Sequence, residues 1–264
     1  MNKIKLNQYI INAFTDVVFK GNPAAVCILD YWLSDEILLK ITQENNLSET
    51  AFVVKINDKY HLRWFTPGGE IDLCGHATLA TAFVYLNYIV PNEKEIAFET
   101  LSGVLTVTLK DDLYTMDFPS FYLKKVDVTD KRKDILGVDI VEAYIGRDLL
   151  CVVNSKEEVH NIVPNFEKIK ELDGLLVHVT AKGDKVDCVS RSFAPKCNIL
   201  EDPVCGSGHC HIVPYWANIL EKDEVVAYQD SFRGGYLYTK LNGNRIELSG
   251  KAVLFSKCEI YLDL

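Results

Sequence analysis

Apolar and polar residues alternate over many short stretches of this chain, a pattern typical of half-buried β-strands. In the first half it predicts strands at 4–14, 24–29, 51–54, 60–65, 96–100, 104–109 and 114–118. In the second half it predicts strands at 143–153, 174–179, 187–193, 224–228, 235–241, 246–248 and 252–262. The sequence therefore predicts a protein built mainly from β-strands.

Helical periodicity is confined to a few segments. The segment 34–44 opens with an N-cap serine and acidic residues, and it places its leucine and isoleucines on one face. The segment 77–88 is apolar and rich in alanine, which predicts a buried helix, and 165–172 is helical in composition. Pro214 lies inside a further helical run, where we expect a kink or a late start because proline has no N–H.

One stretch of the first half recurs in altered form in the second half. Phe65-Thr-Pro67 corresponds to Phe193-Ala-Pro195, and Cys74-Gly75 corresponds to Cys205-Gly206. Cys205 follows Cys74 by 131 positions (205 − 74), about half of the 264 residues. This spacing indicates an internal duplication.

The duplication predicts two similar lobes, which we place at 1–118 and 119–264. The last strand is a candidate to return to the first lobe, and the charged run 124–134 is the expected linker. Each lobe would present one Cys-Gly turn, and the functional site would lie between the lobes.

Composition and charge exclude some classes of function. A net charge of −9 and a pI near 5.2 argue against nucleic-acid binding, which needs clustered Lys and Arg. No stretch of about 18 apolar residues predicts a membrane span, so we expect a soluble, cytoplasmic protein. The eight cysteines include no Cys-x-x-Cys pair and are expected to be free, with Cys27, Cys151 and Cys188 buried.

The two Cys-Gly turns are the first candidates for chemistry. A glycine in a turn that leads into a helix lets backbone N–H groups face an anion at the positive end of the helix dipole. For Cys74-Gly75-His76 and Cys205-Gly206-Ser207, the functional interpretation is a clamp for a carboxylate-bearing substrate. The alternative is that the glycines only permit close strand-to-helix packing. Two copies at matching places favour the clamp.

Several side chains could carry protons. Cys74 and Cys205, facing each other across a small substrate, could act as the base and acid of a cofactor-free racemase, although they could equally be packing residues. Glu49 stands at a strand entry where burial would raise its pKa, but spacing alone favours a solvated or turn glutamate. His76 could donate to substrate or be a satisfied buried histidine, and Asp202 is by default a capping or loop residue.

His209-Cys210-His211 could suggest a metal site. Neighbouring side chains on a helix point in different directions, and no second pair of ligands has metal-site spacing. We therefore predict no metal.

Five ordered motifs together resemble the PhzF-like family of phenazine biosynthesis. They are Gly21-Asn-Pro-Ala-Ala-Val26, Leu47-Ser-Glu-Thr-Ala-Phe52, Phe65-Thr-Pro67 with Asp72-Leu-Cys-Gly-His-Ala-Thr78, Arg191-Ser-Phe-Ala-Pro195 and Glu201-Asp-Pro-Val-Cys-Gly-Ser-Gly-His209. The resemblance covers the whole chain. It implies an α+β fold shared with diaminopimelate epimerase, duplicated into two lobes, each a curved mixed β-sheet wrapped around a central helix.

The resemblance also implies roles for individual residues. Glu49 would shuttle a proton in the isomerisation of a small acid without a cofactor, with His76 and Asp202 as relay partners. The implied substrate contacts are Asn22, Gly75, Gly206 and Ser207.

Two positions depart from the family pattern. Cys205 stands where many members have threonine, and Cys74 stands where the phenazine enzyme has a small residue. Diaminopimelate epimerase holds its catalytic thiols at these places, but its Gly-Asn-Gly pattern is absent here. Our leading hypothesis is an isomerase that uses Glu49 on a small anionic metabolite. The alternatives are a two-thiol racemase or epimerase and a non-catalytic ligand- or partner-binding protein. A homodimer is the expected assembly.

Overall fold

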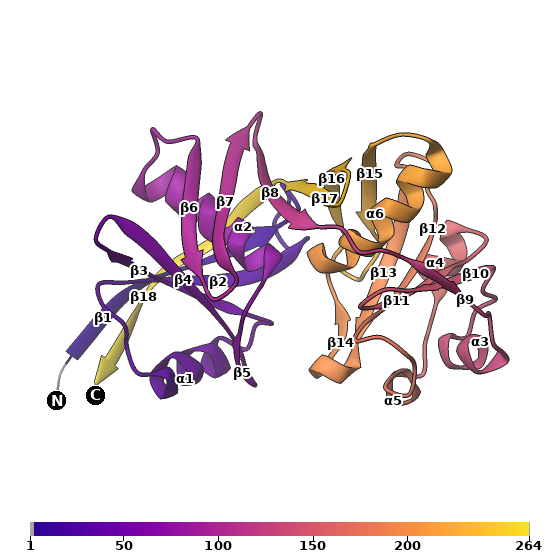
Figure 1. The fold of residues 1–264 in the computed structure, drawn as a ribbon. Helices are drawn as coiled ribbons and strands as arrows, with labels where there is room; N and C mark the ends of the chain where they lie inside the picture. The colour runs from indigo at the N-terminus through magenta and orange to yellow at the C-terminus, as the bar shows by residue number, and fades with distance from the viewer. Residues whose placement is uncertain (1–2, 264) are drawn as a thin grey trace. The chain divides into compact units, whose positions relative to one another are not determined.

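The computed structural model describes residues 3–263. Its contacts divide the chain into two compact units. The first lobe comprises the chain up to Asp117 and from Gly250 onward, and the second lobe comprises Phe118–Ser249. Each lobe combines many strands with a central helix, α2 in the first and α6 in the second (Figure 1). The predicted α+β class is confirmed.

The first lobe follows the predicted order of elements. Its strands are β1 (Lys3–Ala13), β2 (Asn22–Leu29), β3 (Thr50–Ile56), β4 (Lys59–Thr66), β5 (Gly69–Ile71), β6 (Glu95–Thr100), β7 (Gly103–Lys110), β8 (Leu113–Pro119) and β18 (Ala252–Asp263). Its helices are α1 (Asp35–Asn45), α2 (Gly75–Val84) and the π-helical turn η1 (Tyr85–Ile89). The C-terminal strand β18 pairs with β1, so this lobe contains both ends of the described chain.

Helix α2 is buried on almost all sides, from His76 to Ala82 and at Val84. Its small side chains let β1, β2 and β3 pack closely against it. The hydroxyls of Thr78 and Thr81 donate to carbonyls one turn earlier, at 2.5 and 2.7 Å. The two buried threonine hydroxyls are thereby satisfied within the helix itself.

The second lobe contains strands and helices in a comparable order. Its strands are β9 (Lys124–Val126), β10 (Glu142–Ile145), β11 (Leu149–Val152), β12 (Val177–Lys182), β13 (Cys188–Ala194), β14 (Ile199–Asp202), β15 (Glu224–Gln229), β16 (Gly235–Asn242) and β17 (Arg245–Gly250). Its helices are α3 (Asp130–Leu136), α4 (Lys156–Asn161), α5 (Phe166–Ile169), the 3₁₀ turn η2 (Pro195–Cys197) and α6 (Gly206–Leu220).

The two lobes share one topology. In the first lobe, parallel β2 and β3 are joined through α1, and parallel β4 and β6 are joined through α2. In the second lobe, parallel β11 and β12 are joined through α4 and α5, and parallel β13 and β15 are joined through α6. Neighbouring pairs such as β1–β2, β3–β4, β12–β13 and β15–β16 are antiparallel. The duplication predicted from the Cys-Gly repeat is therefore present in the fold.

The predicted linker at 124–134 is wrong, because this charged run is folded. β9 pairs with β10, and Thr129 caps α3 by accepting the N–H of Arg132 at 3.3 Å. Ile135 and Leu136 then insert into the core of the second lobe. Most charged residues of this short helix are exposed, and Arg132 is buried with its side chain bonded to the Asp127 carbonyl and to Asp173. The composition of the run therefore resembles a linker although the segment is folded.

Helix α6 begins at Gly206 and continues through Pro214, so the expected late start is wrong. A proline leaves the carbonyl four residues earlier without its helical partner. That carbonyl belongs to Cys210, and it accepts the N–H of Phe121 at 3.0 Å. A partner from outside the helix thus compensates for the missing hydrogen bond.

The strand predicted over 143–153 is in fact a hairpin. β10 and β11 pair antiparallel, with Ile145 opposite Leu149, and Gly146-Arg147-Asp148 forms the turn. β11 is buried throughout and β10 ends in Ala-Tyr-Ile, so apolar residues flank the turn on both sides and the two strands read as a single run. The charged turn between them becomes important in the site described below.

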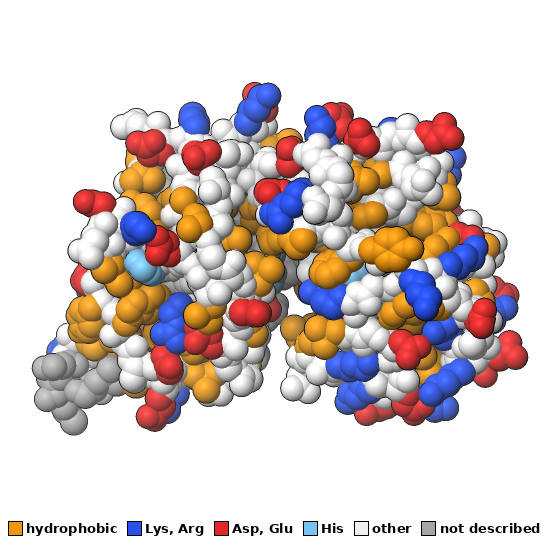
Figure 2. Space-filling view, viewed as in Figure 1, with side chains coloured by type: hydrophobic (Ala, Val, Ile, Leu, Met, Phe, Trp, Pro, Cys, Tyr) orange, Lys and Arg blue, Asp and Glu red, His pale blue; other side chains and the backbone are white. Residues whose placement is uncertain are grey.

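The surface charges and the cysteines agree with the sequence, which predicted free thiols and no cluster of Lys and Arg. On the face shown in Figure 2, basic and acidic side chains are interspersed without an extended basic patch. All eight cysteines are free, and Cys27, Cys151 and Cys188 are fully buried as expected. Within residues 3–263, every helix is too short or too polar to span a bilayer.

Candidate active site

The first lobe brings three predicted residues into one buried cluster. Glu49 directly precedes β3, Cys74 is the N-cap of α2, and His76 lies in the first turn of that helix. His76 Nε2 lies 3.0 Å from Glu49 Oε2, and His76 Nδ1 lies 3.5 Å from the Cys74 sulfur. The imidazole therefore bridges the thiol and the carboxylate.

Backbone pairing fixes Glu49 at this position. Its carbonyl accepts the N–H of Ala25 at 3.3 Å, and the next residue, Thr50, pairs with Phe65 of β4. Asn22, also predicted as a site residue, is fully buried at the start of β2 and stands opposite Ala13 in the β1 register. The strand entries of β2 and β3 thus hold two of the predicted residues.

Burial governs the ionisation of this cluster. Desolvation lowers the pKa of His76, but the neighbouring Cys74 and Glu49 outweigh it, so the pKa is raised well above the ordinary 6.5. Desolvation raises the pKa of Cys74, and Glu49 adds to that effect. The acidic neighbours therefore favour a protonated imidazole at His76.

The contact between His76 Nε2 and Glu49 Oε2 is close but lacks the alignment of a hydrogen bond. Both atoms are buried, and neither has an aligned hydrogen-bond partner within residues 3–263. Two buried polar atoms 3.0 Å apart attract as charges, but they still have unused hydrogen-bonding capacity.

The second lobe forms the equivalent turn at the N-terminus of α6. Cys205 is the N-cap, and its sulfur accepts the N–H of Gly208 at 3.3 Å. Asp202 ends β14, and its Oδ1 accepts the N–H of Val204 at 3.2 Å. Desolvation raises the pKa of the Cys205 thiol well above its usual value, and Asp202 raises it further. This cysteine serves the turn as a neutral capping group.

Gln229 fastens the second turn from the neighbouring strand β15. Its side-chain oxygen accepts the N–H of Cys205 at 2.8 Å, and its amide donates to the carbonyl of Asp202 at 2.5 Å. The glutamine is fully buried. It fixes the turn that contains Gly206 and Ser207 in one conformation.

Arg147 contacts this turn, although the sequence did not suggest it as a site residue. It comes from the hairpin turn between β10 and β11. Its Nη2 donates to the Ser207 hydroxyl at 3.0 Å and to Asp148 Oδ2 at 2.5 Å, and its guanidinium lies 5.3 Å from the centre of the Phe121 ring. Contact with Asp148 outweighs partial burial and raises the pKa of Arg147. A permanent positive charge is therefore placed at the positive end of the α6 dipole. The Gly-Arg-Asp triplet that interrupts two apolar runs was the available signal.

Asp148 anchors the arginine from inside the lobe. It is fully buried, and it lies 3.1 Å from His178 Nε2 and accepts the N–H of Leu176 at 3.2 Å. Burial alone would raise its pKa, but His178 and Arg147 outweigh burial and hold the pKa well below the usual range. The carboxylate is thus ionised and fully hydrogen-bonded.

His211 connects this network to the turn. Its Nε2 accepts the N–H of Asp148 at 3.2 Å, and its Nδ1 lies 3.2 Å from the Ser207 carbonyl. Burial and the nearby His178 lower the pKa of His211 to about 4. A neutral His211 with both nitrogens engaged is a supporting residue under the turn.

Two groups within residues 3–263 bring three potential metal ligands within 4.8 Å of one another. They are Glu49, Cys74 and His76, and Asp148, His178 and His211. In the second group, the Asp148 oxygens and His211 Nε2 already have partners within the protein, so an ion would have to displace existing hydrogen bonds. The predicted motif His209-Cys210-His211 contributes only its last residue to these groups.

Two lobes of one topology, each with a Cys-Gly turn before its central helix, define a class of duplicated α+β folds. Known proteins agree with this class. A family model described as phenazine biosynthesis-like protein, PhzC-PhzF, matches residues 11–258. An uncharacterised isomerase of Pseudomonas aeruginosa is 42% identical over 259 residues, which cover 98% of this chain and 100% of that protein.

Solved structures give the same result. A phenazine biosynthesis protein of the PhzF family from Enterococcus faecalis is 50% identical, with a TM-score of 0.96 over 98% of this chain and 100% of that chain. A hydroxyproline epimerase from Agrobacterium vitis shares the fold at 10% identity, with a TM-score of 0.66 over 98% and 93% of the two chains. The chain belongs to the PhzF-like, phenazine biosynthesis-like family, and it is an isomerase. The predicted resemblance is confirmed.

Proposed function

We propose that this isomerase moves a proton on a small carboxylate-bearing metabolite without a cofactor, and that Glu49 is the general acid/base. The observation that carries the proposal is the buried contact of Glu49 Oε2 with His76 Nε2 at 3.0 Å. A general base needs a carboxylate that is held in place and shielded from water. The contact with a protonated His76 supports both conditions.

His76 gives the cycle a positive charge beside Glu49. In the resting state the imidazolium stabilises the Glu49 carboxylate as a base. When Glu49 takes a proton from the substrate, the carboxyl becomes neutral and the adjacent imidazolium can stabilise negative charge that develops on the substrate. Glu49 then returns the proton to a different carbon, and the residues regain their starting charges.

Anion binding is the role we assign to the two helix turns. The first turns at Gly75 and at Gly206-Ser207 each offer backbone N–H groups at the positive end of a helix. Arg147 adds a guanidinium 3.0 Å from the Ser207 hydroxyl, supported by Asp148. A carboxylate is the group that such donors complement best. A small anionic metabolite is therefore the proposed substrate class. The proposed assembly is a homodimer, as expected for a compact enzyme.

A two-thiol racemase is the second candidate, because Cys74 and Cys205 occupy the same N-cap position of the two central helices. Burial raises the pKa of both thiols, which disfavours the thiolate that one of them would need. The Glu49 mechanism needs no thiolate. For this reason we place the carboxylate first.

Hydrogen exchange distinguishes the candidates. The protein is incubated in deuterated water with a panel of small amino acids and unsaturated carboxylic acids, and incorporation of deuterium at carbon is followed by NMR. Glu49→Gln keeps the shape of the side chain and should abolish exchange, whereas the Cys74→Ser and Cys205→Ser variants should retain it. Loss in either thiol variant with retention in Glu49→Gln would establish the two-thiol mechanism. Thermal stabilisation by an acid without any exchange would favour a protein that only binds its ligand.

A further inference from the structure

The second lobe contains a cavity of about 400 Å³ that shares no residue with the two clusters described above. Its walls come from α4, from the turn after β12, and from β13, β15 and β16. Pockets for small organic ligands occupy roughly 300–1,000 Å³. The cavity is therefore large enough for a compact metabolite.

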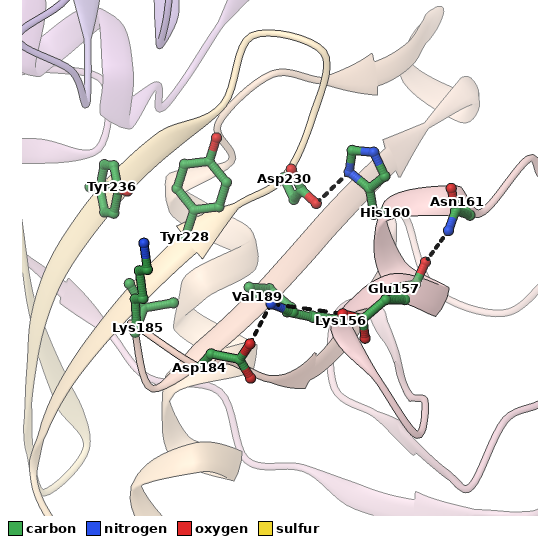
Figure 3. A pocket seen from close by; sticks show the side chains of 11 residues that line it. Lys156, Glu157, His160, Asn161, Asp184, Lys185, Val189, Tyr228, Asp230 and Tyr236 are labelled. Atoms are coloured by element: carbon green, nitrogen blue, oxygen red, sulfur yellow. Dashed lines mark hydrogen bonds and ion pairs between the residues drawn. The ribbon is translucent and has the colours of Figure 1, made fainter.

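Aromatic and apolar side chains form one wall of the cavity. The rings of Tyr228 and Tyr236 have centroids 4.8 Å apart and are tilted by 49°, and Val186 and Val189 lie in the same lining. Figure 3 shows Tyr228 with the face of its ring toward the viewer and Tyr236 edge-on beside it. Tyrosine rings and valine side chains in one lining favour a flat, apolar body.

The charges of the lining are almost all paired. Lys156 pairs with Asp184 and, at 3.7 Å, with Glu157. His160 Nδ1 contacts Asp230 at 2.9 Å, so each carboxylate of the lining has a partner (Figure 3).

Lys185 differs from the other charged residues of the lining, because it makes no ion pair within residues 3–263. In Figure 3 its ammonium end points toward the two tyrosine rings. Lys185 therefore offers a cation without an acidic partner beside the aromatic wall.

We propose that this cavity binds a planar aromatic carboxylate. The ring lies against Tyr228 and Tyr236, and the carboxylate pairs with Lys185. The assignment is independent of the proton-transfer function proposed above, because the cavity and the clusters have no residue in common.

The test uses 2-naphthoate as the probe and 2-naphthamide as its neutral analogue, both titrated into the full-length protein by isothermal calorimetry. We expect saturable binding of 2-naphthoate. Lys185→Gln should weaken it about threefold, the scale of an exposed ion pair, and should leave 2-naphthamide unchanged. Tyr236→Leu should weaken both probes roughly tenfold through loss of the ring contact.

Lys182→Gln is the matched control, because Lys182 is exposed on the same segment and lies outside the lining. It should bind 2-naphthoate like the native protein, and thermal unfolding checks that all variants are folded. The proposal is overturned if the native protein binds 2-naphthoate more weakly than about 10 mM. It is also overturned if Lys185→Gln or Tyr236→Leu leaves the affinity unchanged, or if Lys182→Gln lowers it as much as Lys185→Gln does.

Discussion

Asp148→Asn tests the network that supports the second helix turn. The native carboxylate is fully buried and accepts from Arg147 Nε at 3.0 Å, from Arg147 Nη2 at 2.5 Å and from the N–H of Leu176 at 3.2 Å, beside His178 at 3.1 Å. The amide keeps the size of the side chain but removes its charge. The half-buried Arg147 guanidinium then loses its counter-charge.

Breaking a buried ion pair on one side costs about 3–5 kcal/mol, because the remaining charge is left uncompensated. We expect a loss of this size in the free energy of unfolding at pH 7, measured by urea denaturation. Asp184→Asn makes the same chemical change at an exposed carboxylate of the same lobe, and it should cost less than about 1 kcal/mol. A loss below about 1 kcal/mol for Asp148→Asn as well would refute the reasoning.

The pH dependence gives the same prediction a second readout. The pKa of Asp148 in the folded protein is depressed, so its contribution to stability is present above the unfolded-state value near 3.8. It is lost as the pH falls through the folded-state pKa. The difference in stability between native protein and Asp148→Asn should therefore be constant from pH 5 to 7 and shrink in acid. A difference that grows below about pH 4 would contradict the assignment.

Three further predictions follow from named contacts. In histidine NMR titrations, His76 should gain its proton well above pH 6.5 and His209 only near pH 4, and a titration of His76 below 6.5 would contradict its pairing with Glu49. Gly208→Ala should destabilise the second lobe by about 1–3 kcal/mol in urea denaturation, because the new methyl carbon would lie 2.7 Å from His178 Cε1. An unchanged free energy of unfolding would mean that the turn relaxes freely. Gln229→Ala should cost about 1–3 kcal/mol in the same assay, because it removes the acceptor of the buried Cys205 N–H and the donor to the Asp202 carbonyl.

The sequence determined the elements that depend on local patterning. Alternation of apolar and polar residues located most strands, and the spacing of Cys74 and Cys205 revealed the duplication. Both signals are local or repeated along the chain, so they survive without knowledge of tertiary contacts. The five ordered motifs identified the family, and through it an isomerase fold.

Tertiary structure decided the features that depend on contacts between distant segments. Pro214 remains inside a helix because Phe121, 93 positions earlier (214 − 121), supplies the missing hydrogen bond. The hairpin turn at Arg147 and Asp148 was hidden because apolar residues flank it on both sides, at the end of β10 and throughout β11. A hydrogen-bond partner far along the chain leaves no periodic trace in the sequence.

The same distinction applies to the candidate site. The motifs named Glu49, Cys74 and His76 as separate candidates, and spacing alone favoured an ordinary role for Glu49. Only the fold places the imidazole of His76 between the thiol and the carboxylate, and these two neighbours raise its pKa against the opposing effect of burial. Arg147 became part of the second turn in the same way, through a contact 60 positions along the chain. Sequence determines which chemical groups are present, but the charge that each one carries depends on the neighbours that folding brings to it.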